Sequence, residues 1–89
     1  MKTDQDIIND AATKASQELH LPMNGCVDKL SLLRLWAALY AVHGGDAELM
    51  RHWLNTHNNH LGFNPATRLC DENSLNKMIS YLEYFINVL

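Results

Sequence analysis

The amino-acid sequence predicts an all-α protein: a small bundle of four to five helices, with a loop containing glycine, proline and asparagine before a short helix and a long C-terminal helix. Apolar residues recur at helical spacing in several segments, and no segment of useful length alternates polar and apolar residues. With 89 residues, 47% of them hydrophobic, the chain can form one domain with a modest core. Residues 1–24 are expected to form an N-terminal helix and linker, and residues 25–89 the main domain, within a single compact unit.

The first helix is expected over residues 3–19. Thr3 can cap its start, because a threonine side chain accepts a hydrogen bond from the first helical turn. Pro22 removes a backbone donor and the Asn24-Gly25 pair supplies a turn, so the helix ends before them. Its apolar residues lie at helical spacing: Ile7, Ile8, Ala11, Ala12, Ala15 and Leu19.

The second helix is expected from about residue 26 to residue 43, where Gly44-Gly45 ends it. It is apolar almost all round. One side carries Leu30, Leu33, Ala37, Tyr40 and Ala41, and the rest carries Leu32, Leu35, Trp36 and Leu39. Such a helix must be covered on more than one face. Because the chain is short, we expect a second copy to supply part of that cover, in a homodimer.

Three further segments complete the prediction. Asp46 is a natural cap for a short helix, "DAELMRHWLNT", with these residues facing inward: Leu49, Met50, Trp53 and Leu54. Pro65 suits the first turn of a brief helix, "PATRL". Asp71 or Asn73 can cap the last helix, whose core stripe is expected to comprise Leu75, Met78, Ile79, Leu82, Phe85, Ile86 and Leu89.

Composition and charge limit the kinds of partner and the cellular compartment that can be expected. The net charge of -3 gives no basic face for nucleic acid, and weakly favours a basic protein partner. The start, "MKTDQDIIND", lacks the features of a signal peptide, and "LLRLWAALYAV" is interrupted by Arg34 and too short to span a bilayer. Cys26 and Cys70 are therefore expected to be two reduced, partly buried thiols in a cytoplasmic protein.

The stretch "HWLNTHNNHLGFNPATRL" holds three histidines and four asparagines. A zinc site is disfavoured, because His52, His57 and His60 lack the cysteine or carboxylate ligands of a closed tetrahedral site. Histidines and asparagines that hydrogen-bond a tight loop are the favoured interpretation. Cys70 has no motif that would activate its thiol and is expected to be a small buried residue. No phosphate-binding glycine loop is present. We expect no catalytic residue, no cofactor and no enzymatic activity.

The last helix carries an aromatic surplus. Beside its core stripe, "YLEYFINVL" adds Tyr81, Tyr84 and Val88 on an adjoining face. Most apolar helical stripes belong to a core, and that reading is favoured for the stripe itself. Tyrosines also serve as interface anchors, so the adjoining face is a candidate partner-binding surface. Both interpretations can hold on different faces of one helix.

The segment "MRHWLNTHNNHLGFNPATRLCDENSLNKMISYLEYF" resembles the toxin-binding domain of the Xre/MbcA/ParS antitoxin family. In that family a helix ends in Trp-Leu or Trp-Met, a loop carries Leu-Gly and then proline, and a final helix carries Tyr-Leu-acidic. The matching loop positions here are Trp53, Leu54, Asn58, Leu61, Gly62, Pro65, Arg68 and Leu69, and those in the final helix are Tyr81, Leu82 and Glu83. The resemblance covers about residues 29–85 and implies that the loop is architectural.

The resemblance implies that residues 25–89 form an antitoxin domain. Such a domain neutralises a cognate toxin, of the RES or ADP-ribosyltransferase-like kind, by covering its active site. The candidate toxin-binding residues are Tyr81, Tyr84, Phe85, Val88 and Leu89. Only about 25 residues precede the second helix, too few for the helix-turn-helix domain of the family, so DNA binding by this chain is not expected. The alternatives are a helical dimerisation or adaptor domain without a toxin, and a transcriptional regulator of reduced size.

Overall fold

The computed structural model describes residues 1–21 and 26–88, and within these residues helices joined by loops are the main secondary structure. The helices are α1 (Asp4–Leu19), α2 (Lys29–Val42), α3 (Ala47–Leu54) and α4 (Glu72–Val88), with a 3-10 helix, η1 (Pro65–Arg68), between the last two. The β-type pairing among these residues is an isolated bridge between Asn58 and Phe63. The predicted all-α bundle is confirmed.

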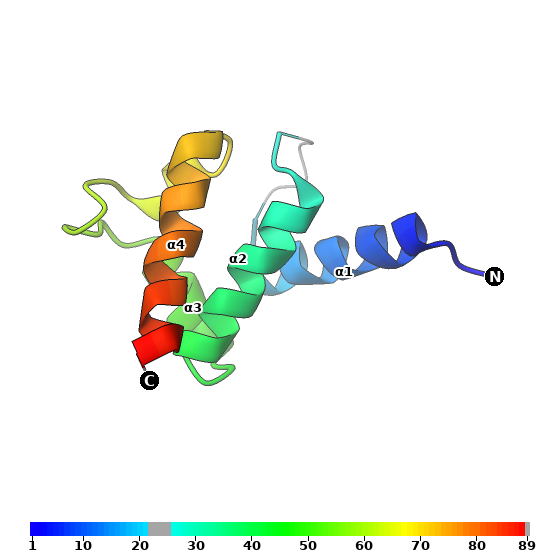
Figure 1. Cartoon of the computed structure of the whole chain (residues 1–89), viewed down its shortest axis with the longest axis horizontal. Coiled ribbons are helices and arrows are strands. Elements are labelled where there is room, and N and C mark those ends of the chain that lie inside the picture. Colours follow the sequence, from blue (N-terminus) through cyan, green and yellow to red (C-terminus); the bar gives the residue numbers. More distant parts are fainter. Residues whose placement is uncertain (22–25, 89) are drawn as a thin grey trace.

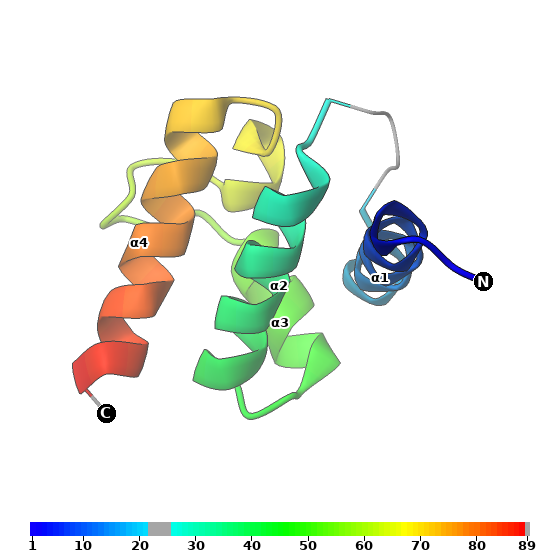
Figure 2. The same ribbon diagram turned by 45° about the vertical axis from the view of Figure 1, so that its right-hand side comes forward.

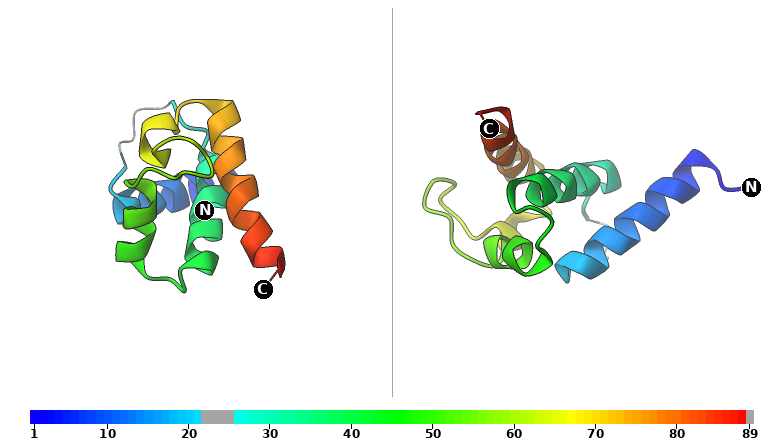
Figure 3. Two further views of the ribbon diagram at one scale, coloured as in Figure 1. Left: turned by 90° about the vertical axis from the view of Figure 1, so that its left-hand side faces the viewer. Right: turned by 90° about the horizontal axis from the view of Figure 1, so that it is seen from below.

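Helix α2 lies at the centre of the arrangement. In Figure 2, α4 lies along one side of α2 and α1 lies on the other. Both α2 and α4 begin at the same end of the molecule and run in the same direction (Figure 1). Helix α3 and η1 close the space beside them, and the loop before η1 projects from the bundle near α4 (Figure 3). The loop and α4 together therefore form one side of the molecule.

The core is built where these elements meet. It consists almost wholly of aliphatic side chains, with one residue from α1, three from α2, two from α3, four from α4 and Leu69 after η1. Its members are Leu19, Leu35, Ala38, Leu39, Met50, Leu54, Leu69, Leu75, Met78, Ile79 and Leu82. The predicted stripe of α4 is thus confirmed over four positions. Phe85 is 38% exposed, so its assignment to the core was wrong, and Leu89 lies outside the described residues.

Helix α1 begins as predicted. The Thr3 hydroxyl accepts from the Asp6 backbone N–H while the Asp6 carboxylate accepts from the Thr3 N–H, a capping box. The apolar spacing was only partly a guide to burial, because Ile7 is 55% exposed. The N-terminal half of α1 extends beyond the other helices (Figures 1 and 3), which agrees with this exposure. The expected break at Pro22 and the Asn24-Gly25 turn lie outside the described residues.

Helix α2 begins at Lys29, three residues later than expected from Cys26. Its cap is Asp28, whose carboxylate accepts from the Ser31 N–H at 3.0 Å. At its other end Gly44 and Gly45 both have positive φ, as a glycine ending predicts. A Cβ on Gly45 would lie 2.8 Å from the Tyr40 ring, so the tyrosine requires a glycine there.

One side of α2 is uncovered. Leu32, Leu35 and Leu39 are buried, whereas Leu30 is 60% and Tyr40 47% exposed. This exposed side leaves room for the additional cover that was expected from a second copy.

Helix α3 follows its predicted cap. The Asp46 carboxylate accepts from the N–H groups of Glu48 and Leu49. Met50 and Leu54 are fully buried, but Leu49 is 50% exposed and Trp53 is only half-buried. The helix is two turns long and contributes a narrow contact, so the inward assignment of Leu49 was wrong.

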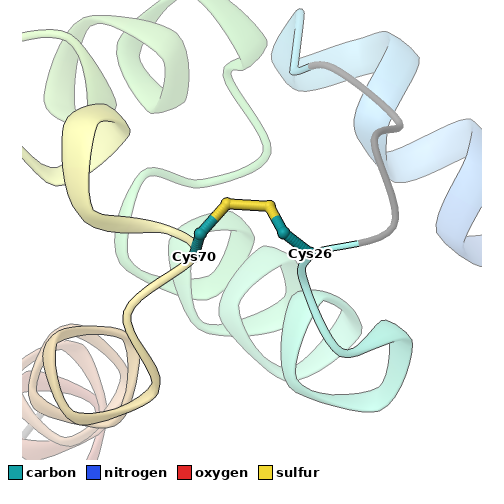
Figure 4. Close-up of a disulfide and its surroundings, with 2 residues drawn as sticks. All are labelled: Cys26 and Cys70. Atoms are coloured by element: carbon teal, nitrogen blue, oxygen red, sulfur yellow. A yellow bond between two sulfur atoms is a disulfide. The ribbon is translucent and has the colours of Figure 1, made fainter.

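The two cysteines form a disulfide, contrary to the expectation of reduced, partly buried thiols. Cys26 and Cys70 lie 44 residues apart in the sequence and 5.3 Å apart between Cα atoms, and both are exposed. Cys26 precedes α2 and Cys70 precedes α4 (Figure 4). Because α2 and α4 begin at the same end, the residues just before them become neighbours. That parallel arrangement is a tertiary property that cysteine spacing does not encode.

No helix in the described part of the chain is both long enough and apolar enough to span a membrane.

Candidate functional site

The loop between α3 and η1 is held by its own hydrogen bonds. The Asn58 N–H donates to the Phe63 carbonyl at 3.0 Å, and the Gly62 N–H returns to the Asn58 carbonyl at 2.7 Å. The Asn58 side chain accepts from the Leu61 N–H at 2.9 Å. Gly62 has a φ of +87°, a conformation that side chains disfavour. The loop is therefore a defined turn whose shape depends on an asparagine and a glycine.

The residues that carry the family resemblance come together around this turn. Leu54, Pro65 and Leu69 are buried, and Trp53 and Leu61 pack against the core. The Arg68 guanidinium lies 5.5 Å from the centre of the Phe63 ring, a cation–π contact. These residues anchor both ends of the loop, in agreement with an architectural role.

The histidines of the stretch do not converge. Among the described residues no group of three or more histidines, cysteines or acidic residues could hold a metal ion. His60 instead stacks on Tyr81 of α4, with ring centroids 4.8 Å apart. Two of the three, His52 and His57, line a small hollow of about 180 Å³ together with His43, beside Trp53. Asn55, Asn58 and Asn64 carry most of the side-chain hydrogen bonds of the stretch, and the His52 ring adds a contact with the Thr56 hydroxyl at 3.4 Å.

Aromatic rings accumulate along α4. Tyr81 is the central member, since it contacts Trp53 (centroids 6.5 Å apart), His60 and Phe85 (5.0 Å, edge to face). Tyr84 meets Phe85 edge to face at 5.7 Å. Tyr84 is 63% exposed, and Val88, one turn further on, is 60% exposed. The predicted aromatic surplus of this helix thus lies on the surface, except for half-buried Tyr81.

A groove of about 780 Å³ runs between α4 and the loop. Four of its lining residues are aromatic or aliphatic: Leu61, Tyr81, Tyr84 and Phe85. Five are polar or basic: His60, Asn73, Asn76, Lys77 and Ser80. The size falls in the range of binding pockets, and three of the five candidate toxin-binding residues line it. Val88 is outside the lining set, and Leu89 is outside the described residues.

The opposite side of α4 is fixed to α2 by a charge pair. The Arg34 guanidinium donates from Nε to Glu83 Oε2 at 3.0 Å and from a terminal nitrogen to Oε1 at 2.6 Å. These hydrogen bonds, and then the charge of Glu83, raise the pKa of Arg34 above its usual value. Glu83, the acidic residue of the Tyr-Leu-acidic sequence, therefore turns away from the groove.

Sequence reasoning missed the polar half of the groove. Asn73, Asn76, Lys77 and Ser80 belong to no motif, and only their register reveals them. They lie on the turns that precede Tyr81 and Tyr84, at spacings of three and four residues that share a helix face. The groove itself depends on where the loop lies, and no local pattern specifies that.

Comparison with known proteins finds no family model that matches this chain and no curated protein that is similar to it.

Proposed function

We propose that this chain is an antitoxin-like protein that binds a cognate protein toxin through the groove side of α4 and neutralises it by covering its active site. The toxin, on the resemblance of residues 29–85, is of the RES or ADP-ribosyltransferase-like kind. The chain itself supplies binding and no chemistry. The observation that carries the proposal is the row of exposed aromatic and aliphatic side chains at the end of α4.

Three features of that row support a partner-binding role. Tyr84 and Val88 lie on neighbouring turns and are both more than half exposed. Contact between such large apolar side chains and water is unfavourable. Tyrosines provide contact area with little loss of conformational entropy. The groove beside them is long and half apolar, which suits an inserted side chain.

Growth rescue tests the proposal. Cells that express the toxin encoded by the neighbouring open reading frame are expected to grow when this chain is co-expressed. Tyr84→Ala should weaken binding by about 2 kcal/mol, or about thirty-fold, and lose much of the rescue. Deletion of residues 85–89 should lose more. Ile7→Ala on α1 is the control, because Ile7 is also exposed but belongs neither to the groove lining nor to the exposed side of α2.

Thermal melts of each variant separate binding from folding. Tyr84→Ala should melt close to the wild-type chain, because the buried stripe of α4 does not include Tyr84. Full rescue by a folded Tyr84→Ala protein and by the truncated chain would exclude this surface as the toxin contact.

A homodimer through α2 is a second candidate role, favoured by the exposure of Leu30 and Tyr40. A dimer of this kind would leave the groove open. Light scattering at micromolar concentration should give twice the mass of one chain, and Tyr40→Ala should shift the mass toward one chain. A monomeric wild-type chain would remove this candidate.

We also propose a cytoplasmic location, where the toxin would act. That compartment keeps most thiols reduced, so the fold must persist without the Cys26–Cys70 bond. Both cysteines are exposed and neither belongs to the core cluster, which supports a fold that survives reduction. Fractionation of cells that express the chain, followed by its detection in the cytosolic fraction, tests this location.

A further inference from the structure

We infer that the groove receives an acidic segment of the partner protein, with a carboxylate beside Lys77 and an apolar side chain against the rings of Tyr81 and Tyr84. This inference rests on the proposed function, because it specifies the chemistry of the partner at the same surface. Three observations carry it: the division of the groove along α4, the sign of its charge, and the unpaired state of its lysine.

The groove is divided along the helix axis. Asn73, Asn76 and Lys77 line it on the first turns of α4, and Tyr81, Tyr84 and Phe85 line it further along. From residue 73 to residue 85 a helix rises about 18 Å. That length corresponds to about five or six residues of extended chain. The groove therefore matches a short peptide segment with a polar end and an apolar end.

The charge of the groove is opposite to that of the chain. The whole protein has 10 acidic and 7 basic residues, yet the groove lining includes Lys77 and no aspartate or glutamate. Three acids of this region, Asp71, Glu72 and Glu83, are absent from the groove lining. The Asp71 carboxylate accepts hydrogen bonds from Ser74 at the start of α4, and Glu83 is paired with Arg34 on the α2 side.

Lys77 makes no ion pair within the described part of the chain, although its positive charge contributes to the lowered pKa of Asp71. The side-chain amides of Asn73 and Asn76 likewise make no hydrogen bond there, and each amide can donate two. An ammonium and two amides along one edge of a groove are complementary to a carboxylate. Beside aromatic side chains the attraction is less screened than on an open surface.

The aromatic half favours a protein over a small anion. The apolar surface continues past the groove to Val88, which is 60% exposed, so the occupied area extends beyond what a single carboxylate ligand covers. A segment that carries an acidic residue a few positions from an aromatic or aliphatic residue satisfies both halves.

A phage-displayed library of random 12-residue peptides, panned on the full chain, tests the inference without knowledge of the partner. The selected peptides should combine aspartate or glutamate with a nearby aromatic or aliphatic residue. On the Lys77→Glu chain these peptides should be lost and basic residues should replace the acidic ones. Lys14→Glu makes the same charge change on exposed α1 and should select the same peptides as the wild-type chain.

A selected peptide then gives the quantitative measurement. Its affinity should fall at least about ten-fold with Lys77→Glu, and also when salt is raised from about 50 mM to about 500 mM. Tyr84→Ala should weaken it at either salt concentration. Thermal melts confirm that each variant is folded.

Several outcomes overturn the inference. These are the failure of any peptide to be enriched, peptides without an acidic preference, and equal binding by the wild-type and Lys77→Glu chains. A mass from light scattering that falls from two chains to one with Lys77→Glu would show that a second copy covers the groove. Growth rescue that is lost with Tyr84→Ala but kept with Lys77→Glu would retain the proposed function and remove only the acidic partner.

Discussion

The His60 imidazole lies stacked against the Tyr81 ring, with their centroids 4.8 Å apart. His60 belongs to the turn closed by Asn58 and Phe63, whereas Tyr81 lies within α4. This contact therefore joins the loop to the helix across the groove. Because Tyr81 also meets Trp53 and Phe85, the stack holds the aromatic half of the groove together.

Removal of this stack should have a small and specific effect. His60→Ala should cost about 1 kcal/mol of unfolding free energy, the usual range for an aromatic pair, and the protein should stay folded. His57→Ala is the control, because His57 stacks on no ring among the described residues, and should change the unfolding free energy by less than about 0.5 kcal/mol. Urea unfolding measures both. Equal losses would show that the stack does not contribute.

Two leucines of α2 should differ sharply when truncated. Leu35 is fully buried, whereas Leu30 on the same helix is 60% exposed. Leu35→Ala should cost about 2–5 kcal/mol, because it removes buried apolar area and leaves a cavity. Leu30→Ala should cost less than about 0.5 kcal/mol in a monomer.

The concentration dependence of the same measurement reports on the dimer. If a second copy covers α2, the cost of Leu30→Ala should grow as the protein concentration is raised, because association stabilises the folded state by mass action. If Leu30→Ala lowered the free energy of unfolding as much as Leu35→Ala at all protein concentrations, the result would contradict the exposed position of Leu30.

Reduction of the disulfide should lower stability without unfolding the chain. In the chain-entropy description, a crosslink between residues separated by 44 positions stabilises the folded state by about 4 kcal/mol. The double variant Cys26→Ser, Cys70→Ser should therefore unfold at lower urea, and a reducing agent should have the same effect on the wild-type chain but none on the variant. Identical midpoints for the oxidised and reduced wild-type chains would contradict this prediction.

Asp71 should make stability depend on acid pH. Hydrogen bonds from the Ser74 hydroxyl, with smaller contributions that include its backbone N–H and the charges of Arg68 and Lys77, lower the pKa of Asp71 below the usual 3.8. A carboxyl group with a lowered folded-state pKa stabilises the protein above its unfolded pKa of about 3.9. That contribution is lost as the pH falls through the folded pKa.

The variant Asp71→Ala should therefore melt below the wild-type chain at neutral pH. The difference should shrink as the pH falls from about 5 to below about 3, because the wild-type carboxyl is then protonated too. Glu72→Gln removes the neighbouring charge without removing the cap, and it should give a smaller difference at neutral pH. A difference that stays constant over this range would assign the effect of Asp71 to something other than its charge.

Local sequence patterns were sufficient to predict where most of the helices begin. Thr3, Asp46, Pro65 and Asp71 each begin a helix as their side chains predict. The reason is that capping and proline geometry act within one turn of the chain. Asp28 is a helix cap that was not predicted, because α2 was expected to begin at about Cys26 and it begins at Lys29. Aliphatic periodicity also identified the buried stripe of α4, where a long helix packs along α2.

Periodicity failed where burial depends on a neighbour. Ile7, Leu49 and Phe85 all have the spacing of core residues and are all exposed. Helices α1 and α4 continue past the elements that would cover Ile7 and Phe85. Helix α3 is only eight residues long and buries a narrow face. The hydrophobic effect rewards burial only where a second surface exists, and the sequence of one helix does not state the extent of its neighbours.

The sequence alone determined the helical class, the caps at Thr3 and Asp46, the presence of a loop containing glycine, proline and asparagine before a short helix, and the aromatic surplus of α4, because each of these depends on residues within a few positions of one another. Only the tertiary structure decided that α2 and α4 run in the same direction. That arrangement brings Cys26 to Cys70 across 44 residues. The tertiary structure also decided that the loop lies beside α4. That position stacks His60 on Tyr81 and forms the groove that Lys77 lines. Contacts between distant segments follow from the packing of whole helices around one core, and no short stretch of sequence contains that information.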